Sequence, residues 1–131
     1  MTDTTFEWLP LEAILELHAE QLEEHGGADG IRDRAALESA LGRPQLIFDY
    51  EQDATLFRLA AAYAYGLTQN HPFVDGNKRI SLIAAGTFLQ LNGWYLDATE
   101  REAVDMMLAL SSKTMDETGF ALWLEQRSTR L

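Results

Sequence analysis

Two strongly apolar segments constrain the fold of this chain more than any other feature. Residues 53–70 and 78–92 are so rich in alanine, leucine and aromatic side chains that a helix formed by either has little polar surface to offer to water. Such helices are stable only when other elements cover them. The sequence therefore predicts two buried central helices, joined by the polar segment NHPFVDGNKR at residues 70–79.

Shorter helices are predicted around this pair. Apolar residues recur at three- and four-residue spacing over 10–25, and helices are also expected over 33–41, over 100–112 and from residue 118 or 119 onwards. Gly42 and Pro44 are expected to end the second helix, Gly93 to close the helix over 78–92, and 94–99 to be extended. We therefore expect an all-α helical bundle that forms a single domain over residues 1–131.

The charge balance excludes several classes of protein. The 131 residues include 10 Lys and Arg against 21 Asp and Glu, a net charge of −11. Domains that bind nucleic acid or an anionic membrane need basic surfaces, so neither is expected as a partner. There is no cysteine for a disulfide, a thiolate metal site or a nucleophile. The first residues lack the pattern of a signal peptide, and a cytoplasmic location is expected.

The segment between the central helices has the features of a phosphate-binding loop. Proline disfavours helical geometry at the preceding residue, so His71 is predicted to be extended at the end of the first central helix. Gly76 can adopt positive φ, which lets the consecutive N–H groups of Gly76, Asn77 and Lys78 point into one concavity. The second central helix begins there, and the positive end of its dipole attracts anions.

The side chains of this segment fit the same interpretation. Asp75 offers a carboxylate of the kind that Mg²⁺ prefers, Lys78 and Arg79 add positive charge, and His71 can accept a proton from a hydroxyl near neutral pH. Phe73 is interpreted as an apolar anchor. Each residue alone also fits a capping histidine, a turn or surface charge, but their concentration between two apolar helices favours a site.

Two further interpretations concern a metal site at His71 and the role of His18. His71 and Asp75 have the four-residue spacing of a helical metal pair, but Pro72 and Gly76 disfavour a helix there. His18, on the apolar face of the first predicted helix, is interpreted as a core histidine rather than a ligand.

The motif HPFVDGNKR resembles the signature of the Fic/Doc family, and the resemblance to its death-on-curing branch extends over nearly the whole chain. The further matching segments lie at residues 18, 25–27, 30–33, 37–40, 43–44, 88–89 and 92–93. The resemblance implies ATP as co-substrate and a Mg²⁺ ion. His71 would deprotonate a protein hydroxyl and Asp75 would bind the metal. Gly76, Asn77, Lys78 and Arg79 would form the nucleotide-binding loop.

Two positions bear on the reaction. In the adenylylating branch of the family a glycine stands where this chain has Lys78, and a second arginine stands at the position of Leu82. The lysine form resembles the branch that transfers the γ-phosphate to elongation factor Tu and stops translation. Phosphoryl transfer to a translation factor is therefore expected. An AMP transferase and a catalytically weak nucleotide- or partner-binding module are the alternatives.

The resemblance also implies a partner. Many family members inhibit themselves with a (Ser/Thr)-x-x-x-Glu segment, and no glutamate here has Ser or Thr four residues before it. We expect instead a separate, cognate antitoxin, whose segment folds into a helix on binding beside the site. The helix over 10–25 and the loop after it are its expected dock.

Overall fold

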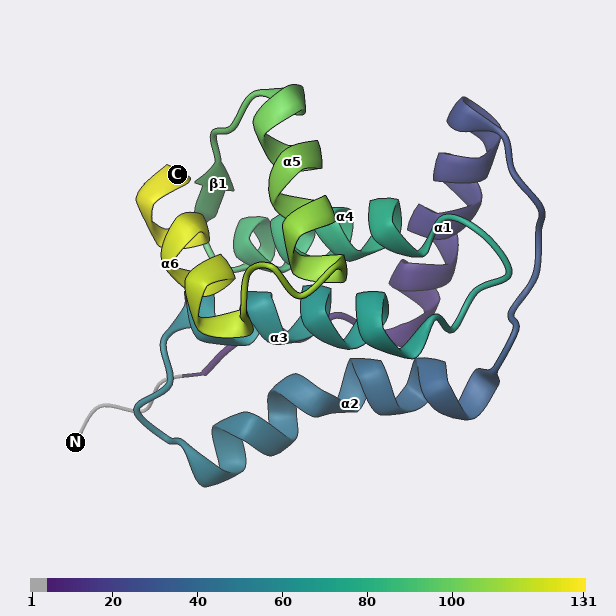
Figure 1. Cartoon of the computed structure of the whole chain (residues 1–131). Helices are drawn as coiled ribbons and strands as arrows, with labels where there is room; N and C mark the ends of the chain where they lie inside the picture. The colour runs from purple at the N-terminus through teal and green to yellow at the C-terminus, as the bar shows by residue number, and fades with distance from the viewer. Residues whose placement is uncertain (1–4) are drawn as a thin grey trace.

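The computed structural model of the chain describes residues 5–131, and it is helical apart from one two-stranded sheet (Figure 1). Its elements are α1 (Leu11–His25), α2 (Arg34–Tyr50), α3 (Leu56–Asn70), α4 (Asn77–Leu91), β1 (Trp94–Leu96), α5 (Glu100–Ser111), α6 (Glu117–Arg127) and β2 (Ser128–Arg130). The predicted all-α fold is confirmed. Within the described residues, no helix combines the length and hydrophobicity of a bilayer span.

Helix α3 is the buried centre of the molecule, as predicted. Its first turn is capped by Thr55, whose hydroxyl accepts a hydrogen bond from the N–H of Arg58 at 3.1 Å. The helix packs against α2, α4 and α6, and Figure 1 shows it between α2 and α4. Gly66 permits the close approach of α2, because a Cβ there would lie 3.2 Å from the Cα of Ala40. Most side chains of α3 are consequently shielded from water.

Helix α4 is the second central helix. Ile80, Ala84, Ala85 and Phe88 are fully buried within the core that α4 shares with α3. Gly93 follows the helix with φ of +86°, which is the left-handed conformation expected for it. Both ends of the loop at residues 71–76 are therefore attached to rigid, buried helices.

Helix α2 corrects the predicted boundary. Gly42 and Pro44 were expected to end it after residue 41, but it continues through both for nine more residues, to the end given above. A proline inside a helix removes one hydrogen bond and crowds the carbonyl four residues earlier, at a cost of about 3 kcal/mol. Burial of Pro44, with Ile47 and Phe48 packed against the core, offsets that cost. The helix bends partway along its length (Figure 1).

The C-terminal part of the chain contains α5, α6 and the two-stranded sheet. Thr99 caps α5 by accepting a hydrogen bond from the N–H of Glu102. Asp116 caps α6 by accepting one from the N–H of Gly119, so that α6 begins slightly earlier than predicted. Strand β1 lies within the segment expected to be extended. It pairs antiparallel with β2, which was not predicted, in the register Trp94 to Arg130. The chain end therefore packs beside the end of α4.

Candidate functional site

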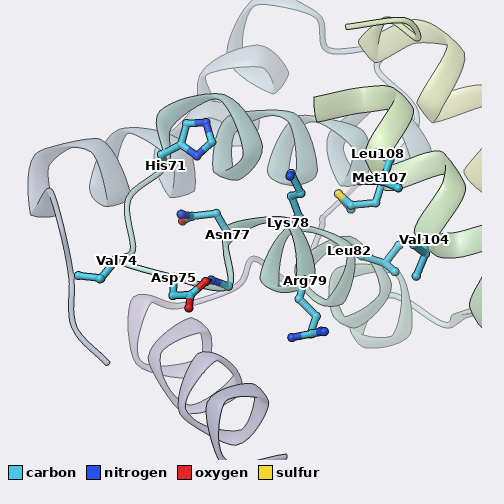
Figure 2. A pocket seen from close by; sticks show the side chains of 11 residues that line it. His71, Val74, Asp75, Asn77, Lys78, Arg79, Leu82, Val104, Met107 and Leu108 are labelled. Carbon is cyan, nitrogen blue, oxygen red and sulfur yellow. The ribbon is translucent and has the colours of Figure 1, made fainter. Parts of the chain in front are cut away.

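The segment that joins α3 to α4 lines a pocket of about 400 Å³ (Figure 2). All the residues predicted to form the site line it, together with four apolar residues of α4 and α5. The lining comprises His71, Val74, Asp75, Gly76, Asn77, Lys78, Arg79, Leu82, Val104, Met107 and Leu108. The polar wall of the pocket was thus found from the sequence. The apolar wall on α5 was not, because it comes from a part of the chain with no distinctive motif.

His71 follows the last residue of α3 but is not extended, so the predicted conformation is wrong. Its φ and ψ are 46° and 55°, in the left-handed region. The conformation also ends the helix, and it redirects the chain so that Phe73 enters the core. The side chain of His71 is exposed at the pocket and has no hydrogen bond to any residue of the range 5–131. The ring is therefore accessible to a substrate.

The loop is closed by Phe73 and Asn77. Phe73 is 1% exposed, which confirms its role as an anchor. The side-chain oxygen of Asn77 accepts from the N–H of Phe73 at 2.9 Å, and its amide donates to the carbonyl of Phe73 at 2.9 Å. Because the side chain of Asn77 is engaged within the loop, its contact with a ligand would come from its backbone N–H.

Within residues 5–131, Asp75 is the only carboxylate that lines the pocket. Its Oδ1 accepts from the N–H of Gly76 at 2.8 Å, and its Oδ2 lies 3.3 Å from the N of Ala28, in the loop after α1. Each oxygen keeps lone pairs that can bind a cation. One exposed carboxylate beside a phosphate-binding loop fits Mg²⁺, which commonly takes one or two protein carboxylates and fills its other positions with phosphate and water.

No helical metal pair is formed. The residues between His71 and Asp75 are not helical, so their four-residue spacing does not place the two side chains on one helix face. No cluster of three or more potential metal ligands occurs in residues 5–131 either. A metal site here consequently depends on oxygen atoms that a ligand would supply.

The N-terminal end of α4 is open to an anion. Gly76 precedes it with φ of +80°, as expected, and no side chain in the described part of the chain caps this end. N–H groups in the first helical turn have no partner within the helix, and the positive end of the dipole lies there. Lys78 and Arg79 are exposed and take part in no ion pair with a described residue. In Figure 2 they leave α4 in opposite directions, Lys78 toward the side of His71 and Arg79 toward that of Asp75.

His18 is a core residue, as interpreted, and it also contacts the loop between α3 and α4 from the core side. It is 4% exposed, its ring stacks on that of Phe73 with centroids 3.7 Å apart, and Nε2 lies 2.8 Å from the carbonyl oxygen of Asp75. A carbonyl oxygen only accepts hydrogen bonds, so Nε2 carries the proton. The sequence could not identify this contact, because 57 positions separate the two residues.

A second segment that carried no chemical prediction also holds the loop. Ile31 forms an isolated antiparallel bridge with Phe73, and the N–H of Val74 donates to the carbonyl of Gly30 at 3.0 Å. The loop is thus held along its backbone by residues 30–33 and from the core by α1.

The sequence is similar to a known family and to two of its proteins. The family model described as "Fic/DOC family" matches residues 8–89, which is more than half of the chain. "Protein kinase doc" of Escherichia phage P1 is 35% identical over 82 residues, 63% of this chain and 65% of the relative. "Toxin Doc" of Mycolicibacterium smegmatis (strain ATCC 700084 / mc(2)155) is 37% identical over 94 residues, 70% of this chain and 72% of the relative. The alignment therefore spans just under two thirds of the phage relative and somewhat more of the mycobacterial one.

Proposed function

Because this chain belongs to the Fic/Doc family, we propose that it is a toxin that transfers the γ-phosphate of ATP to a hydroxyl group of a protein. The observation that carries the proposal is the arrangement of one pocket. An exposed histidine, a single carboxylate and two cationic side chains lie around the open N-terminal end of a helix. These are the parts that phosphoryl transfer requires, since the protein mainly positions the reactants and stabilises charge.

His71 is the proposed general base. Its ring accepts the proton of the acceptor hydroxyl as the hydroxyl oxygen forms a bond to the γ-phosphorus. The bond between the γ-phosphorus and the bridging oxygen to the β-phosphorus breaks, so ADP leaves with that oxygen. The protonated ring then releases its proton to water. The exposure of His71 and the lack of a hydrogen bond to any residue of the range 5–131 support this role.

The phosphates are assigned to the start of α4. The N–H groups of Asn77, Lys78 and Arg79 belong to the first turn of α4, where the dipole favours negative charge, and both cationic side chains line the pocket. Asp75 would hold a Mg²⁺ ion together with phosphate oxygens. When bound, the ion would neutralise part of the phosphate charge.

Phosphoryl transfer is proposed rather than AMP transfer because of two pocket residues. Lys78 stands where the adenylylating branch has glycine, and Leu82, a pocket residue here, stands where that branch has a second arginine. The printed name of the phage relative, a protein kinase, agrees with this choice. The proposed acceptor is a hydroxyl, preferably of threonine, on a translation factor such as elongation factor Tu.

A cognate antitoxin is the proposed partner, since one relative is named as a toxin. Val74, Val104 and Leu108, which line the pocket, are 52%, 48% and 47% exposed, and this exposed apolar surface supports docking of a partner helix beside the site. The expected dock on α1 and its following loop lies at the Asp75 side of the same pocket (Figure 2).

The reaction is tested with ATP labelled at either the γ- or the α-phosphorus, in the presence of Mg²⁺ and elongation factor Tu. We expect label in the acceptor only from the γ-position. His71→Ala should abolish transfer while ATP binding and the unfolding transition are retained. His25→Ala, a change of the exposed histidine at the end of α1, is the matched control and should keep full activity.

The outcomes separate the candidates. Label from the α-position alone would replace the proposal with an AMP transferase. Absence of either label with folded, ATP-binding protein would favour a binding module. Full activity of His71→Ala would remove His71 from the role of base.

A further inference from the structure

The C-terminal end of α3 lacks a hydrogen bond that commonly closes a helix. The last carbonyl groups of a helix have no partner within it, and a left-handed ending usually satisfies them with N–H groups of the residues that follow. Here the residue after His71 is Pro72, which has no N–H. The carbonyls at this end therefore need a donor from elsewhere in the chain.

The side chain of Arg32 donates a hydrogen bond to each of two carbonyl groups at this end. Its Nε donates to the carbonyl oxygen of His71 at 2.6 Å, and its Nη2 donates to the carbonyl oxygen of Asn70 at 2.8 Å. These carbonyls belong to the two peptide groups on either side of the His71 Cα. Because a guanidinium group holds its N–H bonds in a rigid plane, it fixes the two peptide groups relative to each other. Its charge also suits the negative end of the α3 dipole.

The backbone of His71 needs such a constraint. A left-handed φ of 46° is uncommon for a residue with a side chain, and it persists only where the surroundings enforce it. The ring itself has no hydrogen bond to a residue of the described range that could orient it, whereas a catalytic base is generally oriented by a third group. The direction of the ring is consequently set through its main chain.

We infer that Arg32 is a positioning residue that aims the ring of His71 into the pocket by fixing the peptide groups on both sides of it. The role depends on the proposed function, since a base is positioned only if His71 is one. Arg32 does not line the pocket, and its side chain acts on the reaction through His71 alone.

The change Arg32→Ala leaves the rest of this contact in place. The N–H groups of Arg32 and Asp33 both donate to the carbonyl of Pro72, at 2.7 and 3.1 Å, and backbone bonds do not depend on the side chain. Phe73 also stays anchored in the core. The variant is therefore expected to fold.

Two readouts test the role. The first is the set of backbone carbon chemical shifts of His71, which report φ and require no activity. We expect them to move away from left-handed values in Arg32→Ala and to be unchanged in Arg34→Ala. Arg34 is the matched control, because its exposed guanidinium pairs only with Glu38, at 3.2 Å. Arg32→Lys keeps the positive charge but lacks the planar guanidinium group, so its His71 chemical shifts should resemble those of Arg32→Ala.

The second readout is steady-state phosphoryl transfer. We expect kcat of Arg32→Ala to fall by about 10- to 100-fold, with KM for ATP within about twofold of the unaltered protein, because the base moves while the phosphate-binding end of α4 does not. Unchanged His71 shifts in Arg32→Ala, or kcat equal to that of Arg34→Ala, would overturn the inference. Inactivity of the unaltered protein would instead refute the proposed function, and the chemical shifts would still decide whether Arg32 holds His71.

Discussion

Among the individual side chains of the site, the carboxylate of Asp75 lies against the loop after α1, where its Oδ2 accepts from the N–H of Ala28 at 3.3 Å. A Cβ at Gly27 would lie 3.0 Å from Asp75 Oδ2, whereas a Cβ at the adjacent Gly26 would meet nothing within 4 Å. Both glycines have positive φ, at 125° and 78°, so an alanine strains the backbone at either position. At Gly27 the added Cβ would also crowd the side chains of Asp75 and Leu22, each with an atom 3.0 Å away.

Gly27→Ala is therefore expected to raise the Mg²⁺ concentration for half-maximal transfer by about 10-fold, which is typical when a neighbour of a metal ligand is altered. Gly26→Ala should lose comparable stability without this shift. Titration of activity with Mg²⁺ measures the effect, and equal Mg²⁺ requirements in the two variants would contradict the placement of the ion at Asp75.

Tyr63 links the centre of α3 to the N-terminal segment. It is fully buried, and its hydroxyl accepts a hydrogen bond from the N–H of Leu9 at 3.1 Å. Burial raises the pKa of Tyr63 above its ordinary value of 10, although the hydrogen bond from Leu9 opposes the rise. The folded chain thus keeps the phenol proton at a pH where the unfolded chain loses it, so stability falls as pH rises above about 10.

Tyr63→Phe should cost about 1–3 kcal/mol at pH 7, because the buried N–H of Leu9 loses its acceptor. Above pH 10 the difference from the unaltered protein should shrink, by at most about 1.4 kcal/mol per pH unit. Tyr50→Phe, at a site that is 88% exposed, is the control and should show neither effect. Urea unfolding at pH 7 and above pH 10 measures both; a constant difference would refute the alkaline titration of Tyr63.

For single residues, the sequence predicted the polar lining of the pocket but neither its apolar lining nor the contacts that hold the loop. Pro72 and Gly76 are local signals, and they placed the end of α3 and the start of α4 correctly. Arg32 donates to the carbonyl of His71, and His18 donates to the carbonyl of Asp75. Contacts of that kind join residues far apart in the chain, so no spacing rule reveals them.

Between the helices, one carboxylate joins three elements. Glu117, in the first turn of α6, lies 2.6 Å from Arg43 of α2 and 2.8 Å from Arg58 of α3. Its side chain is 15% exposed. Burial opposes the charge of Arg58, but hydrogen bonding to Glu51 and the charges of Glu117 and Glu51 outweigh it and raise the pKa of Arg58. Glu117 thus provides a shared counter-charge for Arg43 and Arg58 where α2, α3 and α6 meet.

Glu117→Gln should therefore destabilise the fold by about 1–3 kcal/mol, because two half-buried guanidinium groups lose their shared counter-charge. Glu38→Gln removes the partner of an exposed pair, with side chains 59% and 60% exposed, and should change stability by about 0.5 kcal/mol or less. Urea unfolding of both variants measures the two stability losses. Equal stability losses would mean that the junction contributes no more than a surface pair.

The helices themselves could be predicted where the pattern is local. The apolar helices α3 and α4 follow from the sequence, but the cap at Thr55 was not predicted, and α3 begins at Leu56 rather than at residue 53. The continuation of α2 through Pro44 could not be predicted, since it results from burial of that proline against other helices. Strand β2 was missed because three residues carry no periodic signal, and only its pairing with β1 defines it.

Over the molecule as a whole, negative charge dominates but is unevenly distributed. The chain carries a net charge of −11, yet the pocket combines Lys78, Arg79 and the positive end of α4 with the single carboxylate of Asp75. A nucleic-acid partner is not expected from the sequence, because no basic stripe accompanies these groups. A small anion such as a nucleotide phosphate is a better match to this local concentration of positive charge.

We propose that His71 serves the transfer of a phosphoryl group to a translation factor. The most direct measurement is a mass spectrum of the translation factors from cells that express the chain without its antitoxin. We predict that one of them, elongation factor Tu foremost, gains the mass of a single phosphate on a hydroxyl residue, and that expression of His71→Ala leaves it unmodified. A gain equal to AMP, an unmodified set of factors, or the same phosphate gain with His71→Ala would contradict the claim.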